Sequence, residues 1–168
     1  MNATDNIVLI GMPGVGKSTV GVLLAKAMSR SFVDTDVVIQ AGEGRRLQDI
    51  IDTDGMDAFC AIEERRVLAL ACRRSVIATG GSVVYSAPAM RHLKASGVVV
   101  HLDLSLDTLK KRLTNLDSRG LVMGRDQTLE QLFHQRDPLY HEYADFTIDC
   151  ENLTHEQVVE RIVHALDP

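Results

Sequence analysis

Apolar residues along this chain alternate between short uninterrupted runs and longer helical repeats. The short runs, each three to five residues long and rich in β-branched side chains, occupy 7–10, 31–33, 75–78, 98–102 and 146–148. Such runs, bounded by turn residues, are typical of strands buried on both faces of a parallel sheet. In 17–28, apolar residues instead recur at helical spacing, as at Val20, Leu23, Leu24 and Ala27, which predicts an amphipathic helix.

Further helical segments separate the other runs. We expect them at about 47–51, 59–70, 88–96, 106–113, 128–134 and 154–166. The last begins at Thr154 with Gln157 three residues later, the spacing of a capping box. Strands that alternate with helices in this way predict an α/β fold with a five-stranded parallel sheet.

Length and charge narrow the class of protein. A chain of 168 residues predicts a single domain, 1–168, with room for a proper core. The formal net charge of −5 argues against nucleic-acid binding, which normally needs a basic face. No apolar run is long enough to span a membrane and no signal-peptide pattern begins the chain, so we expect no membrane partner and a cytoplasmic location.

The cysteines and histidines suggest no structural metal or disulfide framework. Cys60, Cys72 and Cys150 are widely spaced and odd in number, which fits neither disulfides nor a zinc knuckle. The six histidines show no H-x-x-x-H spacing, so no structural metal site is expected from them.

Residues 11–18, GMPGVGKS, match the phosphate-loop pattern G-x-x-x-x-G-K-[ST] at every fixed position. The match follows an apolar strand and precedes an amphipathic helix, which is the context that the motif requires. The glycines let backbone N–H groups turn toward phosphates, Lys17 would contact the β- and γ-phosphates, and Ser18 would bind Mg²⁺. The alternative is a glycine-rich turn without a ligand. The sequence therefore predicts a nucleoside triphosphate site with Mg²⁺.

Two carboxylates and a glycine pair follow the next strands. Asp34 and Asp36 leave the second strand two residues apart, and hence on one side of it. One would hold Mg²⁺ through water and the other would orient an acceptor hydroxyl and take its proton; alternatively, either aspartate only caps the next helix. Gly80 and Gly81 end the third strand, where ligands bind in parallel sheets, although a plain turn is the alternative.

A polar, glycine-containing segment at 115–125 has the composition of a mobile lid. Arg119, Arg125 and Arg136 lie in it or after it, and an arginine there could neutralise a transferring phosphoryl group. For any one of them, a solvated surface position is the alternative.

These residues resemble the shikimate kinase family over nearly the whole chain. The similarity is carried by 11–19, 32–36, 52–59, 62–64, 78–81 and 136–140. The resemblance implies a nucleoside-monophosphate-kinase-like three-layer sandwich with helices on both faces of the sheet and a lid at about 113–126. It also implies a monomeric kinase of aromatic amino acid biosynthesis, which transfers the γ-phosphoryl group of ATP to a hydroxyl of shikimate.

The family pattern also implies a role for individual residues. Asp34 would lie near Mg²⁺ with Ser18, and Asp36 would hold the acceptor hydroxyls. Gly80 and Gly81 would line the acid pocket, and Arg136 would pair with the substrate carboxylate. The catalytic set would be Lys17, Asp36 and the lid residue Arg119, and Tyr140 would be core. The nucleotide contacts would be Gly11, Gly14, Val15, Gly16, Lys17, Ser18, Thr19 and Arg112, the last stacked on adenine.

Three positions depart from the family pattern. Cys60 replaces an arginine that helps grip the carboxylate, Ser82 replaces a third glycine, and Gly120 replaces a proline in the lid. Loss of one guanidinium costs about 1.5–3 kcal/mol of affinity, which can change the preferred substrate. Arg65 is five residues from Cys60, about 140° around a helix, which makes direct replacement doubtful, as it is for Arg66. Cys60 itself is either a partly buried filler or a redox-sensitive thiol.

Two rival functions remain, the first motivated by Cys60 and Ser82 and the second by the phosphate loop, which does not by itself distinguish a kinase from a nucleotide sensor. One is a related kinase that phosphorylates another small hydroxy metabolite. The other is a regulator that binds nucleotide and signals through a partner, although such a protein has no evident use for Asp36, Gly80, Gly81 and Arg136.

Overall fold

The centre of the molecule is a five-stranded sheet in which all strands run in the same direction, as the sequence predicts. A computed structural model describes residues 5–114 and 127–166. The strands follow the order β2-β3-β1-β4-β5. Their bounds are β1 (Asn6–Ile10), β2 (Ser31–Asp34), β3 (Ser75–Ala78), β4 (Gly97–Asp103) and β5 (Phe146–Asp149).

Strand β1 lies in the middle of the sheet and is buried along its whole length. Ile7 is the register partner of Val76 in β3 and of Val98 in β4. From β1 the chain goes to β2 at one edge, and after β3 it crosses to β4 on the other side. The loop after β1 therefore opens at a switch point, where parallel sheets of this type bind ligands.

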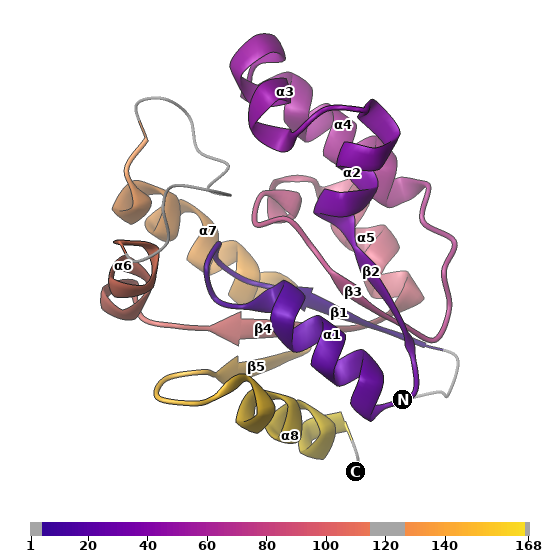
Figure 1. Ribbon diagram of the computed structural model, residues 1–168, viewed down its shortest axis with the longest axis vertical. Helices are drawn as coiled ribbons and strands as arrows, with labels where there is room; N and C mark the ends of the chain where they lie inside the picture. The colour runs from indigo at the N-terminus through magenta and orange to yellow at the C-terminus, as the bar shows by residue number, and fades with distance from the viewer. Residues whose placement is uncertain (1–4, 115–126, 167–168) are drawn as a thin grey trace.

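Helices cover both faces of the sheet (Figure 1). On one face lie α1 (Lys17–Ala27) and α8 (His155–Leu166), and on the other lie α5 (Ala87–Ser96) and α7 (Leu129–Tyr143). Their buried side chains recur at helical spacing, as at Val20 and Leu24 in α1 and at Val158 and Ile162 in α8. At the start of α8, Thr154 and Gln157 exchange both bonds of the predicted capping box.

Three helices form a second, smaller cluster beyond β2 (Figure 1). They are α2 (Thr35–Glu43), α3 (Leu47–Asp54) and α4 (Met56–Leu68). Their own apolar core contains Ile39, Ile50, Ile51 and Phe59. The remaining described helices are η1 (Val83–Tyr85), a single 3₁₀ turn, and α6 (Leu106–Thr114). No helix within 5–114 or 127–166 has the length and apolar content needed to cross a bilayer.

Besides the short turn η1, two helices differ from the sequence-based expectation. Helix α2 was not predicted, and α7 continues to Tyr143 although its pattern predicted an end near His134. Pro138 lies inside α7 and removes one backbone donor. The helix continues because Leu132, Arg136 and Tyr140, on successive turns of one face, are all buried.

Candidate functional site

The phosphate-loop sequence lies between β1 and α1 and turns on glycines with positive φ. Gly11 has φ 141°, and a Cβ there would stand 2.5 Å from the Leu102 carbonyl oxygen of β4. Gly16, at φ 106°, is the N-cap of α1. A loop that ends on a helix N-terminus points its free N–H groups at an anion. The local geometry is therefore that of a phosphate site.

Lys17 begins α1 and is almost fully buried, at 8% exposure. Its Nζ donates to the carbonyl oxygens of Gly11 (2.8 Å) and Met12 (2.9 Å). Burial lowers the pKa of Lys17 to about 8, although nearby Asp36 opposes the shift. Among the described residues no carboxylate forms an ion pair with this amine. A phosphate oxygen can replace the two carbonyls as its partner.

Ser18 and Asp34 bring hard oxygen donors together beside the loop. Ser18 Oγ donates to Asp34 Oδ2 at 2.7 Å. The other oxygen, Asp34 Oδ1, accepts from the backbone N–H groups of Asp36 (3.0 Å) and Val37 (3.4 Å). Asp34 therefore does cap α2, the alternative considered for it, while its second oxygen stays with Ser18. A hydroxyl and a carboxylate fit Mg²⁺, which prefers oxygen ligands.

Asp36 lies in the first turn of α2, and not on the strand, so the two-residue alternation used to place it was wrong. Its Oδ1 is buried and has no hydrogen-bond partner among the described residues. Burial, with a smaller contribution from Asp34, raises the pKa of Asp36 to about 6, although Lys17 opposes the shift. A carboxylate with a pKa near neutrality suits proton transfer from a hydroxyl.

Glu63 of α4 is a member of the site for which the sequence predicted no role. It is 2% exposed; its Oε2 accepts from Ser82 Oγ at 2.6 Å, and its Oε1 has no partner among the described residues. Burial raises the pKa of Glu63 to about 7. A Cβ at Gly80 would collide with Glu63 Oε1 and would stand 2.9 Å from Asp36 Oδ1. The available signal was the four-residue spacing from Phe59, which puts both side chains on the buried face of α4.

Arg136 is a buried cation of α7, at 1% exposure. Its Nε donates to the Tyr85 hydroxyl at 3.1 Å, and its guanidinium lies 5.1 Å from the centroid of that ring. Its Nη1 has no hydrogen-bond partner among the described residues, and it would stand 2.9 Å from a Cβ at Gly81. Tyr140 is core, as predicted, and it also donates its hydroxyl to the Gly81 carbonyl at 2.7 Å. A buried guanidinium with an Nη1 that lacks a protein partner among the described residues is suited to bind an anion.

One cavity of about 760 Å³ is lined by Lys17, Ser18, Asp36 and Arg136. Its size suits a small-molecule site. The predicted residues on its wall are Gly14, Gly16, Lys17, Ser18, Thr19, Asp36, Gly80, Gly81, Arg112 and Arg136. Ser82, which replaces the family's third glycine, also lies on the wall. The other residues on the wall had no predicted site role, namely Pro13, Phe59, Thr79, Leu153, Thr154, His155 and Glu156.

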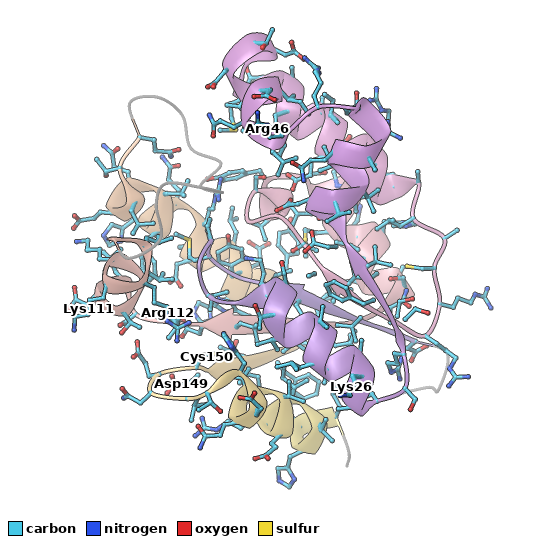
Figure 2. The ribbon with its side chains drawn as sticks, viewed as in Figure 1. Lys26, Arg46, Lys111, Arg112, Asp149 and Cys150 are labelled. Carbon is cyan, nitrogen blue, oxygen red and sulfur yellow. The ribbon has the colours of Figure 1, made fainter. Side chains whose placement is uncertain are left out.

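Three predicted residues do not line the cavity, and the residues singled out in the lid lie outside the described residues. Gly11, Val15 and Asp34 stand behind the wall, where Val15 offers its carbonyl oxygen to Arg112 Nη1 at 3.2 Å. Figure 2 shows Arg112 directed from α6 toward the phosphate loop, whereas Lys111 points outward. Arg119, Arg125 and Gly120 fall within 115–126, outside the described residues, with most of the predicted lid.

Cys60 lies beside the main cavity and not on its wall. It lines a hollow of about 220 Å³ with Glu63, Ser82 and Tyr85 among its neighbours. Burial, followed by the charge of Glu63, raises the pKa of the Cys60 thiol, which favours a filler over a reactive thiolate.

The two arginines that follow Cys60 in α4 do not replace the missing guanidinium. Arg65 and Arg66 both bind Glu43, at 2.9 and 2.7 Å.

Comparison with known proteins identifies the family to which the whole chain is similar. The shikimate kinase family model matches residues 13–167. A shikimate kinase of Thermodesulfovibrio yellowstonii is 42% identical over 161 residues, which cover 94% of this chain and 92% of that protein. The chain belongs to the shikimate kinase family. It is therefore a phosphotransferase that acts on a hydroxyl group, and the predictions of family and enzyme class are confirmed.

Solved shikimate kinases have the same fold. The enzyme of Acinetobacter baumannii in complex with shikimate has a TM-score of 0.88 and 32% identity, and the match covers 96% of this chain and 92% of that one. The enzyme of Aquifex aeolicus has a TM-score of 0.80 and 29% identity, with 96% of each chain covered. The predicted parallel α/β fold with helices on both faces is confirmed.

Proposed function

We propose that this protein transfers the γ-phosphoryl group of ATP to a hydroxyl group of shikimate. The observation that carries the proposal is Arg136, a buried guanidinium whose Nη1 has no hydrogen-bond partner in the described part of the chain, in the same cavity as the phosphate-loop Lys17. One cation suits the carboxylate of the acceptor and the other suits the phosphates of the donor. The reaction belongs to aromatic amino acid biosynthesis, and we expect the chain to catalyse it as a monomer because it supplies every group named here.

The donor side holds ATP through the loop. Lys17 Nζ exchanges its two carbonyl partners for phosphate oxygens, and the glycine-rich backbone donates N–H groups to the same anion. Arg112, already bonded to the Val15 carbonyl, extends beside the adenine. Ser18 and Asp34 would hold Mg²⁺, which when bound neutralises phosphate charge. The lid at about 113–126 would bring Arg119 to the phosphates.

The acceptor side orients the hydroxyl and takes its proton. Asp36 Oδ1, which has no protein partner among the described residues, accepts the hydrogen bond of the acceptor hydroxyl and then its proton as the oxygen attacks. Arg136 fixes the other end of the acceptor by its carboxylate, with Gly80 and Gly81 as the wall between them. Glu63 lies behind Gly80 and Ser82, and when it is ionised its negative charge is attracted to Arg136.

The experiment is an ADP-release assay over a panel of acceptors. Shikimate, quinate, gluconate and homoserine are compared at millimolar concentration with MgATP. We expect shikimate to give the highest kcat/KM. The proposal fails if ADP release does not depend on shikimate.

A second candidate is phosphorylation of a different small hydroxy acid. Cys60, in place of an arginine, and the hollow of about 220 Å³ beside it are the observations that favour this candidate. Faster turnover of another acid in the panel would establish it. ATP binding with no stimulation by any acceptor would instead indicate a nucleotide-binding regulator.

A further inference from the structure

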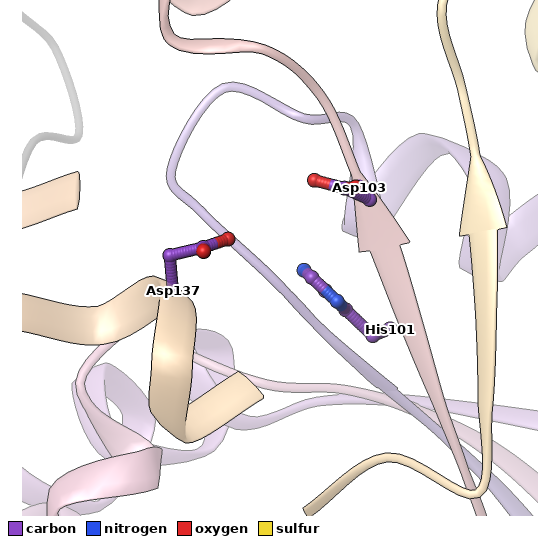
Figure 3. Close-up of side chains that lie close together, drawn as sticks. All are labelled: His101, Asp103 and Asp137. Atoms are coloured by element: carbon purple, nitrogen blue, oxygen red, sulfur yellow. The ribbon is translucent and has the colours of Figure 1, made fainter. Parts of the chain in front are cut away.

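Three metal-ligating side chains converge at a place that the proposed reaction does not use. His101 and Asp103 lie two residues apart on β4, and Asp137 lies on α7. Their potential ligand atoms all lie within 4.8 Å of one another. Figure 3 shows the imidazole directed from β4 toward the two carboxylates, which approach it from different elements.

His101 is buried and incompletely satisfied. It is 1% exposed, and its Nδ1 has no hydrogen-bond partner among the described residues. The ring stacks on Tyr140 with centroids 5.2 Å apart. Burial, followed by the charges of His141 and Lys17, lowers the pKa of His101 to about 3. A buried imidazole with an unpartnered ring nitrogen among the described residues can serve as a metal ligand.

The carboxylates of Asp103 and Asp137 are close enough for their negative charges to repel each other. Burial and then the charge of Asp137 raise the pKa of Asp103. His141, one helical turn after Asp137, lies with its Nε2 3.6 Å from Asp137 Oδ1 and its ring edge-on to His101 at 4.9 Å. Two carboxylates and an imidazole whose ligand atoms lie within 4.8 Å of one another make a site at which a cation offsets the repulsion between the carboxylates.

We propose that His101, Asp103 and Asp137 bind a divalent transition-metal ion of the Zn²⁺ type. Mixed imidazole and carboxylate ligands suit such an ion, whereas Mg²⁺ prefers oxygen ligands alone. Four-coordinate zinc sites often combine these ligand types, and His141 adds a further imidazole beside the cluster, with its Nε2 3.6 Å from Asp137 Oδ1. The site is separate from the Mg²⁺ ligands proposed for Ser18 and Asp34.

The location gives the ion a structural role. It would join β4 to α7, and Asp137 directly follows Arg136, the proposed carboxylate ligand. A Cβ on Gly11 of the phosphate loop would stand 3.4 Å from His101 Cδ2, so the imidazole also lies under the loop. An ion here would fix the helix that carries Arg136 against the strand that supports the loop.

The test measures metal binding without nucleotide or turnover, so it is independent of the proposed reaction. The full chain is stripped with a chelator and titrated calorimetrically with Zn²⁺, and in parallel with Co²⁺ followed by visible absorption. We expect one ion per chain, a Co²⁺ spectrum without thiolate charge-transfer bands, and a melting temperature that rises with Zn²⁺. Asp137→Asn, at a partly exposed position, should weaken binding at least about tenfold.

The controls separate this site from others on the protein. Glu142→Gln removes an exposed carboxylate of the same helix, and Asp34→Asn removes the proposed Mg²⁺ ligand; both should keep the Zn²⁺ affinity of the parent chain. His101→Gln should also lose binding, and its melting curve in chelator reports whether it folds. The proposal is overturned by absence of stoichiometric binding, by unchanged affinity in a folded Asp137→Asn chain, by loss of binding in Asp34→Asn, or by thiolate bands that implicate cysteine.

Discussion

The two sides of the cavity differ in how far the protein satisfies its own charged groups. On the donor side, Lys17 Nζ bonds to two loop carbonyls, and Ser18 bonds to Asp34. On the acceptor side, buried atoms of Asp36, Glu63 and Arg136 have no hydrogen-bond partner within 5–114 and 127–166. A nucleotide must therefore displace hydrogen bonds that already exist. An acceptor instead supplies hydrogen-bond partners to buried atoms that have none among the described residues.

This difference teaches where binding free energy is available. A buried polar atom without a partner costs about 1–3 kcal/mol, and more when charged. An acceptor with a carboxylate and hydroxyls removes that cost when it binds, so the acceptor side is organised in advance at the expense of stability. On the donor side, nucleotide binding exchanges the hydrogen bonds within the protein for hydrogen bonds to the phosphates. The net binding free energy there comes mainly from the negative charge of the phosphates.

Lys17→Ala tests the donor side and should have the largest effect. It removes the cation that faces the phosphates, so kcat/KM should fall by about 10³-fold or more. The measurement is ADP release at saturating acceptor. Lys26→Ala, at an exposed position on the same helix, is the control and should keep its activity; normal turnover in Lys17→Ala would refute the donor-side assignment.

Asp36→Asn tests whether catalysis at the acceptor side can be lost while nucleotide binding at the donor side is kept. Loss of the proposed base should lower kcat by at least about 10²-fold, while the affinity for a fluorescent ATP analogue stays within about twofold. Asp52→Asn, an exposed carboxylate of α3, is the matched control. Near-normal turnover of Asp36→Asn would remove Asp36 from the role of base.

Arg136→Lys tests the difference between the two sides through the binding of the acceptor alone. Lysine keeps the charge but loses the two-pronged grip on a carboxylate, so KM for shikimate should rise about 10- to 100-fold. KM for ATP should change by no more than about twofold. The steady-state split between the two constants is the readout, with Arg91→Lys as a surface control. An equal rise in both constants would show that Arg136 does not belong to the acceptor side.

Glu63→Gln tests the stability cost of the acceptor side through its pH dependence. Burial raises the folded pKa of Glu63 from 4.5 to about 7, so the folded state holds this proton more tightly than the unfolded chain. Between those values, stability falls as pH rises, and the loss is complete above about pH 7. The glutamine stays neutral, and the unliganded variant should exceed the parent by about 1–3 kcal/mol at pH 8.

Chemical denaturation of the parent and Glu63→Gln at pH 4 and pH 8 measures this difference. The advantage of the variant should be small at pH 4, where the parent carboxyl is protonated in both states. Glu160→Gln, at an exposed position, should show no such pH-dependent gain. If the stability advantage of Glu63→Gln over the parent were smaller at pH 8 than at pH 4, the stability cost assigned to the ionised Glu63 carboxylate would be contradicted.

Cys60→Arg should have the smallest effect on the acceptor side. The hollow beside Cys60 offers space for the longer side chain near Glu63. A second guanidinium should tighten shikimate binding by up to about tenfold. Cys60→Ser controls for loss of the thiol. Unchanged or weaker binding in Cys60→Arg would count against shikimate as the acceptor that this pocket prefers.

The strands and the phosphate loop could be predicted because local sequence determines them. A central parallel strand such as β1 must be apolar on both faces, and the loop needs its glycines at fixed spacing. Helix α2 was missed because its first turn, with Asp34 as the cap, resembles the end of a strand. The cap signal was present in the aspartate itself.

Contacts between distant segments could not be predicted in the same way. Glu63 and Arg136 belong to the site because α4 and α7 bring them to the end of β3, and no short motif records that approach. The cluster of His101, Asp103 and Asp137 was not predicted because its ligands come from a strand and a helix and do not follow the H-x-x-x-H spacing of a single helix. The spacing H-x-D on a strand, with D-x-x-x-H on a helix, was the available signal.

Gly81 limits how the substrate preference of this enzyme can evolve. A Cβ there would stand 2.9 Å from Arg136 Nη1 and 3.1 Å from Pro13 of the phosphate loop, so a mutation that adds a side chain would disturb both sides at once. Position 60 touches neither group in this way and opens onto its own hollow. Single mutations that change the acceptor without harming ATP use are therefore more accessible at position 60 of α4 than at Gly81, after the end of β3.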